Sequence, residues 1–146
     1  NEVCKTNAND MFVTAWLGIL TISSGKIIVA NAGHEYPVLR HQNGNFELFK
    51  DKHGLVIGGM EGMRYRDYEL TLEEGDTLFV YTDGVPEATN GELSMFGTDR
   101  MLQALNSKPD VAPQELLENV SKYIAAFVGE AEAKVGLSVK VGYLHG

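Results

Sequence analysis

The sequence contains the stretch Leu78-Phe79-Val80-Tyr81-Thr82-Asp83-Gly84-Val85, in which four apolar residues lead into a carboxylate followed at once by glycine. A short apolar run of this kind is typical of a strand buried on both faces. The end of such a strand is a rigid place for a ligand, and glycine lets a metal ion, water or phosphate come close to the backbone. The stretch therefore predicts a buried strand ending at a site, with Asp83 as the candidate ligand and Gly84 as the residue of close approach.

An Asp-Gly pair is also a common turn between two strands, and composition alone leaves that alternative open. Two observations favour the site. The residues from Pro86 to Gly91 do not resemble a returning strand. In addition, Asp83 closes an apolar run, where a carboxylate without a partner or a metal ion would be costly to bury.

Upstream of this stretch, the pattern predicts two hairpins. Met11–Ile22 and the β-branched run Ile27–Val29 form the first, because a Ser-Ser-Gly-Lys turn separates them. Pro37–His41 and Phe46–Phe49 form the second, because the intervening Asn43-Gly44 pair tolerates the positive φ angles of tight hairpin turns.

Residues Tyr65–Leu72 alternate in polarity, as a half-buried strand does. The acids that follow, at Glu73, Glu74 and Asp76, are interpreted as part of a solvated turn.

Further along the chain, the apolar spacing becomes helical. Thr98 is a predicted N-cap of a helix that runs to about Asn106. A longer predicted helix spans Pro113–Val128, with proline in its first turn and an apolar stripe along one side. The chain then ends in a predicted strand, Val135–Val141. The stripe consists of Leu116, Val120, Tyr123, Ile124 and Phe127.

These elements predict an α+β architecture, with antiparallel strands, helices covering one face, and a last strand that returns to the sheet. Because the alternating strands bury residues that the helical stripe can cover, strands and helices are expected to share one core.

A second polar motif, Asn31-Ala32-Gly33-His34-Glu35, follows a predicted strand. His34 could orient a phosphate or act as an acid, but a tight turn is the simpler interpretation. In that turn Gly33 supplies the backbone conformation and His34 makes a structural hydrogen bond. The other histidines lack zinc-like spacing, and the sequence has no Walker loop, dinucleotide fingerprint or serine nucleophile elbow.

Charge and composition exclude several classes of partner. The 146-residue chain has a formal net charge of −8, so nucleic acid and an anionic membrane surface would be repelled. No apolar run approaches the roughly 20 residues of a membrane span. The single cysteine, Cys4, permits no internal disulfide, which favours a reducing, cytoplasmic setting.

Taken together, the motifs resemble those of the bacterial stage-II-sporulation-E-like phosphatases, which include serine phosphatases that regulate sigma factors. This family belongs to the wider type-2C, metal-dependent phosphatase fold. The match covers nearly the whole chain from about Met11, and the order of the motifs makes it specific. The motifs are Met11-Phe12-Val13-Thr14, Asn31-Ala32-Gly33-His34, the loop around Gly58, Leu72-Glu73-Glu74-Gly75-Asp76, Tyr81-Thr82-Asp83-Gly84-Val85-Pro86-Glu87-Ala88 and Phe96-Gly97.

The resemblance implies an antiparallel β-sandwich flanked by helices, with a site for two Mg²⁺ or Mn²⁺ ions. In such a site the ions activate a water that attacks a phosphoserine or phosphothreonine. The resemblance assigns a metal-ligand role to Asp83 and places Gly84 beside it. It also implies a phosphorylated regulatory protein as substrate, by analogy an anti-sigma-factor antagonist.

The sequence departs from the family pattern at two places. The family has an early Gly-Asp-(Phe/Tyr) strand, and this chain starts after that point. Residues 1–146 are therefore expected to be the C-terminal portion of a single phosphatase-like domain, truncated at its N-terminus. The family also has an Asp-Asp pair entering the last strand, whereas Ala131–Leu137 contains no aspartate. Glu130 and Glu132 are poor replacements, and Lys134 would repel a cation.

From these departures we expect weak metal binding and negligible turnover by this chain alone. An exposed sheet edge would favour self-association, for example as a homodimer. An alternative to the enzyme is a catalytically degenerate, phosphatase-like domain that binds a partner protein as a regulatory module.

Overall fold

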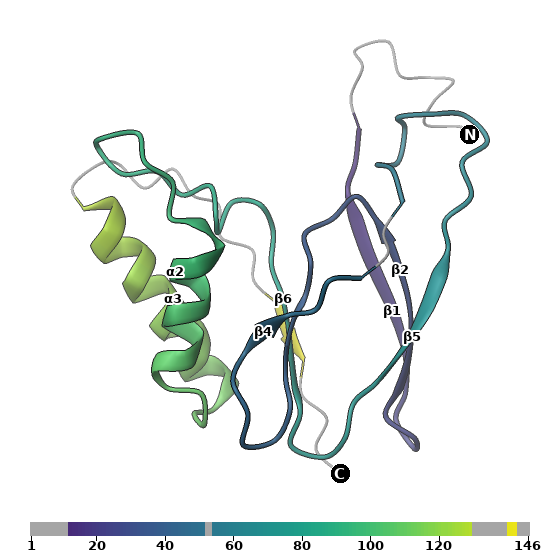
Figure 1. Ribbon diagram of the computed structural model, residues 1–146, viewed down its shortest axis with the longest axis horizontal. Coiled ribbons are helices and arrows are strands. Elements are labelled where there is room, and N and C mark those ends of the chain that lie inside the picture. Colours follow the sequence, from purple (N-terminus) through teal and green to yellow (C-terminus); the bar gives the residue numbers. More distant parts are fainter. Residues whose placement is uncertain (1–11, 52–53, 130–139, 143–146) are drawn as a thin grey trace.

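The computed structural model describes residues 12–51, 54–129 and 140–142, which form three layers (Figure 1). Two helices lie against a four-stranded sheet, and a three-stranded sheet covers the other face of that sheet. The helices are α2 (Gly97–Ser107) and α3 (Pro113–Val128). The four-stranded sheet contains, in order, β4 (Glu47–Leu48), β3 (Val38–Arg40), β6 (Thr77–Val80) and β7 (Lys140–Gly142). The three-stranded sheet contains β1 (Ala15–Thr21), β2 (Lys26–Ala32) and β5 (Asp67–Thr71).

Every ladder between these strands is antiparallel, so the predicted α+β class with antiparallel strands is confirmed. The first hairpin forms as predicted, with Thr21 of β1 opposite Lys26 of β2. Gly25 in its turn has φ +67°, and a Cβ atom there would lie 2.0 Å from the carbonyl oxygen of Leu72. Only glycine fits at this position, which fixes where the hairpin reverses.

The second hairpin joins β3 to β4, and its turn differs in detail from the prediction. The turn spans His41 to Gly44, where the Gly44 N–H donates to the His41 carbonyl oxygen at 2.9 Å. Asn43 has φ +60°, but Gly44 is not among the residues with positive φ. Asparagine therefore supplies the left-handed conformation and glycine closes the turn.

Strand β6 is packed on both faces, as the apolar run predicted, but the core differs from the prediction. Val38 and its partner Phe79 face the helices, whereas Leu39 and its partner Leu78 face the three-stranded sheet. The expectation of one shared core is therefore wrong. Because the side chains of a strand alternate between two faces, the middle sheet separates two buried clusters.

Helix α3 has the predicted bounds, and its stripe is buried at Leu116, Val120 and Ile124, although Tyr123 is exposed. Helix α2 corrects a prediction at its start. Its N-cap position is Phe96, with no capping hydrogen bond from a side chain, so Thr98 is not the cap. The buried Phe96 ring anchors this end of the helix in the core instead.

The last strand is observed as β7, which pairs with β6 through Phe79 and Val141. The rest of the predicted strand, residues 135–139, lies outside the described residues. Met11 lies outside them as well, and the first strand begins at Ala15.

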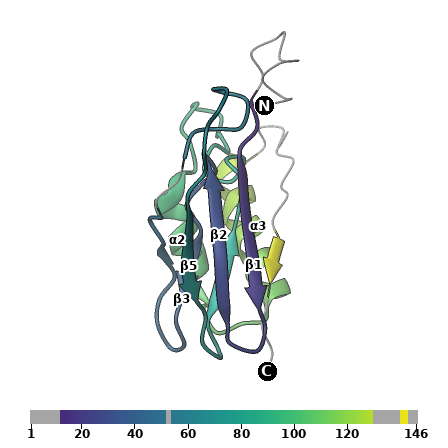
Figure 2. The same ribbon diagram turned by 90° about the vertical axis from the view of Figure 1, so that its right-hand side faces the viewer.

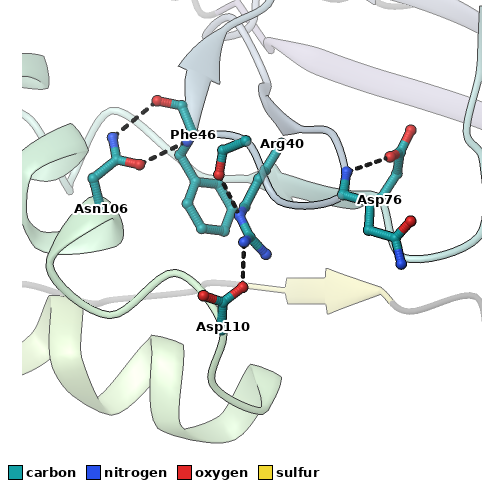
Figure 3. A network of polar contacts seen from close by, with 7 residues as sticks. Arg40, Phe46, Asp76, Asn106 and Asp110 are labelled. Carbon is teal, nitrogen blue, oxygen red and sulfur yellow. Dashed lines mark hydrogen bonds and ion pairs between the residues drawn. The ribbon is translucent and has the colours of Figure 1, made fainter.

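Polar side chains tie the second hairpin to the helices (Figure 3). The Asn106 side chain of α2 accepts from the Phe46 N–H at 2.7 Å and donates to the Phe46 carbonyl oxygen at 3.0 Å. The buried Arg40 guanidinium donates to the Gly44 carbonyl oxygen at 2.8 Å and pairs with Asp110 in the connection between α2 and α3. These contacts hold β3 and β4 against the helical layer.

The outer face of the three-stranded sheet carries exposed aliphatic side chains. Leu17, Ile19 and Ile28 are 65%, 64% and 42% exposed. Ile19 lies opposite Ile28 in the β1–β2 ladder, so the two share a face. Figure 2 views this sheet with the helices behind it, and no helix of the described chain covers its outer face. Among the same residues, no helix has the length and apolar character to cross a membrane.

Candidate functional site

Several strand ends meet at one edge of the sandwich. β2 ends at Ala32, and only five residues separate it from Val38 at the start of β3. β6 is antiparallel to β3, with Phe79 opposite Val38, so the end of β6 lies at the same edge. The His34 motif and the Asp83 motif, which are far apart in the sequence, are therefore brought to one edge.

The electrostatics of Tyr81 support this placement. Burial and, to a smaller extent, the negative charge of the Glu35 carboxylate together raise the pKa of Tyr81 to about 12, although a hydrogen bond with Thr98 opposes the shift. The influence of Glu35 shows that the segment after β2 approaches the end of β6. Tyr81 is thus neutral at physiological pH and acts as a buried support directly before Thr82 and Asp83.

Asp83 lies in a tight turn directly after β6. Its carbonyl oxygen accepts from the Glu87 N–H at 2.9 Å, and the Val85 N–H donates to the Thr82 carbonyl oxygen at 3.0 Å. Val85 is fully buried, which anchors the turn. The segment from Pro86 continues into a loop and then α2, so the predicted absence of a returning strand is confirmed.

The Asp83 side chain is exposed, and Gly84 beside it is half-buried. The expectation that burial would make an Asp83 carboxylate without a partner or a metal ion costly is therefore wrong. The chain turns outward at Thr82, and the carboxylate leaves the core with it. An exposed carboxylate on a rigid turn remains suited to bind a cation, because it keeps its oxygens available at little desolvation cost.

The His34 motif has the structural role that the simpler interpretation gave it. Gly33 has φ +68°, and a Cβ atom there would lie 2.7 Å from Cγ1 of Val56. The His34 Nδ1 atom lies 3.2 Å from the Thr14 hydroxyl oxygen. The fully buried Asn31 accepts from the His34 N–H at 2.8 Å and so closes the turn.

Sequence reasoning missed a polar network between the two sheets. Asp51, which follows β4, accepts from the Asn31 amide at 3.1 Å and from the Tyr68 hydroxyl. Burial raises the pKa of Tyr68, and the hydrogen bond with Asp51 raises it further. In the sequence, Tyr68 is one of the alternating residues of Tyr65–Leu72, and that pattern does not indicate a polar role for it. No signal in the sequence paired Asp51 with Tyr68, because Asp51 lies in the loop after β4 and only the packing of the sheets brings it to β5.

The metal-ligand set is only partly present in the part of the chain that the structure describes. Asp83 offers one carboxylate to a hard cation, which takes six or more oxygen ligands. Within residues 12–51, 54–129 and 140–142, no group of three His, Cys, Asp or Glu side chains could hold a metal ion. These residues fit one ligand of a cation site and do not by themselves form a two-ion site. The Ala131–Leu137 stretch, where the family has its Asp-Asp pair, lies outside the described residues.

The family model of Stage II sporulation protein E (SpoIIE) matches residues 1–134. The chain belongs to the SpoIIE family. It is 29% identical over 129 residues to Protein IcfG of Synechocystis sp. and 26% identical over 123 residues to Phosphoserine phosphatase RsbU of Bacillus subtilis. Each match covers 82% of this chain, which spans 20% of IcfG and 36% of RsbU.

Solved structures confirm the fold for this SpoIIE-family chain. The phosphatase domain of SpoIIE from Bacillus subtilis, presoaked with Mn, matches with a TM-score of 0.67 at 14% identity, over 90% of this chain and 56% of that one. The SiaA-PP2C domain of Pseudomonas aeruginosa matches with a TM-score of 0.63 at 21% identity, over 79% of this chain and 44% of that one. The predicted type-2C, or PP2C, sandwich flanked by helices is therefore confirmed.

Proposed function

We propose that the protein containing this chain is a metal-dependent phosphatase that removes phosphate from a serine or threonine of a regulatory protein. The proposal is supported by SpoIIE-family membership together with the position of Asp83, an exposed carboxylate held by a buried turn at the end of β6. RsbU, a relative that is 26% identical to this chain over 123 residues, is a phosphoserine phosphatase by name.

In this proposal Asp83 supplies one carboxylate ligand to a site for two Mn²⁺ or Mg²⁺ ions, and Gly84 lets an ion or a phosphate oxygen come close to the backbone. When bound, the ions would supply an activated water and neutralise charge on the phosphoryl group. The contribution of the chain is to fix the carboxylate in place. The buried side chains of Tyr81 and Val85, on either side of the turn, restrict its movement.

The substrate class follows from charge and from the relatives. With a net charge of −8, the chain is a poor match for nucleic acid, and a protein is the more suitable substrate. We infer a phosphorylated anti-sigma-factor antagonist as the substrate. A single cysteine fits action in a reducing compartment such as the cytoplasm.

The deciding experiment measures phosphate release from a phosphoserine protein by the full-length protein with Mn²⁺. Asp83→Asn should lower kcat/KM by roughly 100-fold or more, because an amide is a weaker ligand for a hard cation. Glu74→Gln is the matched control, since Glu74 is an exposed acid in the turn at the opposite end of β6. Unchanged activity of Asp83→Asn would show that the role assigned to Asp83 is wrong.

A second candidate function is a protein-binding module without turnover. It is favoured by the stretch Ala131–Leu137, which contains no aspartate and includes Lys134, a residue that would repel a cation. Calorimetric titration of the full-length protein with Mn²⁺ separates the two candidates. Tight binding of two ions excludes the module, whereas the absence of binding excludes the metal-dependent enzyme.

A further inference from the structure

The loop between β6 and α2 presents two exposed apolar side chains, Leu93 and Met95, which we call the apolar tip. Leu93 is 86% exposed, the highest value for a large hydrophobic residue in the described chain, and Met95 is 61% exposed. Exposure of single apolar residues is ordinary in soluble proteins. The case for a binding role therefore depends on how the loop holds these two residues.

Leu93 adopts a backbone conformation that leucine normally avoids. Its φ angle is +62°, and only one other residue that is not glycine, Asn43, has positive φ in the described chain. The left-handed region is unfavourable for leucine, because its Cβ atom crowds the following carbonyl oxygen. Strained residues of this kind persist only where the surroundings fix them, and they concentrate at functional sites and ligand clamps.

Asn90 and Arg100 fix the tip. The Asn90 side-chain oxygen accepts from the N–H groups of Glu92 at 3.1 Å and Ser94 at 2.9 Å. The Leu93 N–H donates to the Asn90 carbonyl oxygen at 3.0 Å, and the Arg100 guanidinium donates to the Met95 carbonyl oxygen at 3.2 Å. The tip is thus held in place before any partner arrives, which lowers the entropy cost of binding.

The same loop carries Asp83. The Phe96 N–H donates to the Ala88 carbonyl oxygen at 2.7 Å, and the Gly97 N–H donates to the Pro86 carbonyl oxygen at 2.8 Å. These two bonds join the base of the tip to the turn in which the Glu87 N–H donates to the Asp83 carbonyl oxygen. A protein seated on the tip would therefore be held in a fixed relation to Asp83.

The charge around the tip defines the chemistry of the partner. Glu87 and Glu92 are exposed acids on the same loop. The nearby Arg100 is exposed as well, but its guanidinium is engaged by two carbonyl oxygens and lies 4.6 Å from the Phe127 ring centroid. An apolar tip with an acidic border fits an apolar pocket with a basic border on another protein.

We propose that the apolar tip is a docking element for the protein substrate, and that Leu93 determines specificity by filling an apolar pocket on that substrate. The identity of the partner as a substrate rests on the proposed phosphatase function. The tip contributes binding energy for the whole protein and takes no part in the chemistry at the phosphate.

The test compares a protein substrate with a small one, using the full-length protein and Mn²⁺. The probes are a serine-phosphorylated anti-sigma-factor antagonist from the same organism and p-nitrophenyl phosphate. In Leu93→Asn the apolar side chain is lost, but asparagine tolerates positive φ, so the loop is retained. KM for the phosphoprotein should rise about tenfold, as for loss of an interface anchor, with kcat unchanged. Turnover of p-nitrophenyl phosphate should change less than about twofold.

Two further variants complete the design. Ile22→Asn removes an aliphatic side chain of similar exposure, 75%, from the β1–β2 turn and should leave both substrates unaffected. Met95→Ser removes the second side chain of the tip without touching the strained position, and should raise KM for the phosphoprotein about threefold. An unchanged KM in both tip variants would overturn the proposal.

Calorimetry of phosphoprotein binding tests the docking role of Leu93 separately from the proposed phosphatase function. If the protein shows no turnover but Leu93→Asn weakens binding about tenfold, the docking role stands and the phosphatase function fails. If turnover is present and the affinity of Leu93→Asn equals that of the wild type, the docking role fails and the phosphatase function stands. Absence of any binding by the wild-type protein also overturns the docking role.

Discussion

At Asp76, one buried carboxylate holds two backbone N–H groups and an imidazole. Its oxygens accept from the Gln42 N–H at 3.0 Å and the Glu73 N–H at 3.1 Å, and Oδ2 lies 2.8 Å from His41 Nδ1. The interpretation of this acid as part of a solvated turn is therefore wrong, because its side chain is 2% exposed. The carboxylate joins the turn before β6 to the turn after β3.

The structure predicts that Asp76→Ala destabilises the chain by about 2 kcal/mol, since it leaves backbone N–H groups without an acceptor. Glu74→Ala, two residues earlier and exposed, should change stability by less than about 0.5 kcal/mol. Urea unfolding at neutral pH measures both. Equal effects of the two variants would contradict the assigned role of Asp76.

The contribution of Asp76 to the stability of the fold should decrease at low pH. Burial would raise the pKa of Asp76, but hydrogen bonds from the Glu73 N–H, His41 and the Gln42 N–H outweigh it and hold the pKa below its ordinary value. Because the pKa of Asp76 is lower in the folded state, its carboxylate stabilises the fold above the unfolded-state pKa of about 4. This stabilisation is lost as the pH falls and the carboxylate is protonated. The difference in stability between wild type and Asp76→Ala should therefore shrink below about pH 4.

At the scale of elements, one side chain of α2 makes two hydrogen bonds to the β3–β4 hairpin. Asn106 bonds both the N–H and the carbonyl oxygen of Phe46, a residue that is 2% exposed. Asn106→Ala would leave both groups buried without partners, and we expect a loss of about 3 kcal/mol. Gln103→Ala, at an exposed position of the same helix, is the control. Thermal and urea unfolding of the two variants should differ, and similar stabilities would contradict this role of Asn106.

How closely the sequence predicts a helix or strand depends on whether residues near in the sequence or distant residues determine its ends. The hairpin at Gly25 and the helix Pro113–Val128 are fixed by local spacing and by glycine and proline, so the sequence predicts them closely. The start of α2 was predicted at a Thr98 cap, but the buried Phe96 ring determines it through tertiary packing. Local capping rules do not include such packing.

The same limit applies to the candidate site. The sequence correctly placed Asp83 just beyond the end of a buried strand, and the assignment of Asp83 as a metal ligand stays a prediction that the experiment described above tests. The Asn31–Asp51–Tyr68 network could not be predicted, since its members come from three segments that only the sheet packing brings together. The exposure of Asp83 could not be predicted either, because it depends on the outward turn at Thr82.

At the scale of the whole molecule, the layers are covered unequally. The four-stranded sheet lies between the helices and the second sheet, but the outer face of β1, β2 and β5 is open in the described chain (Figure 2). Alternation along a strand normally places polar residues on such a face. On this sheet the polar residues gather on β5 and at the start of β2, where Lys26 pairs with Glu69. The outer face of β1 and the middle of β2 instead carry an apolar stripe of Leu17, Ile19 and Ile28, and β1 pairs on one side only among the described strands. An apolar stripe beside a sheet edge that is unpaired among the described residues favours association.

We therefore predict that the isolated chain self-associates through this face at high concentration. Ile19→Lys should shift the population toward monomer, because a charge in the centre of the apolar stripe would have to be desolvated on association. Ile22→Lys changes an isoleucine that is 75% exposed in the β1–β2 turn, beyond the paired residues of the strand, and should leave association unchanged. Light scattering over a concentration series distinguishes the variants.

Since Ile19 is 64% exposed, its replacement should not impair folding, so a lower mass in Ile19→Lys would reflect loss of the interface and not misfolding. A wild-type chain that stays monomeric throughout the series would show that the open face does not drive association.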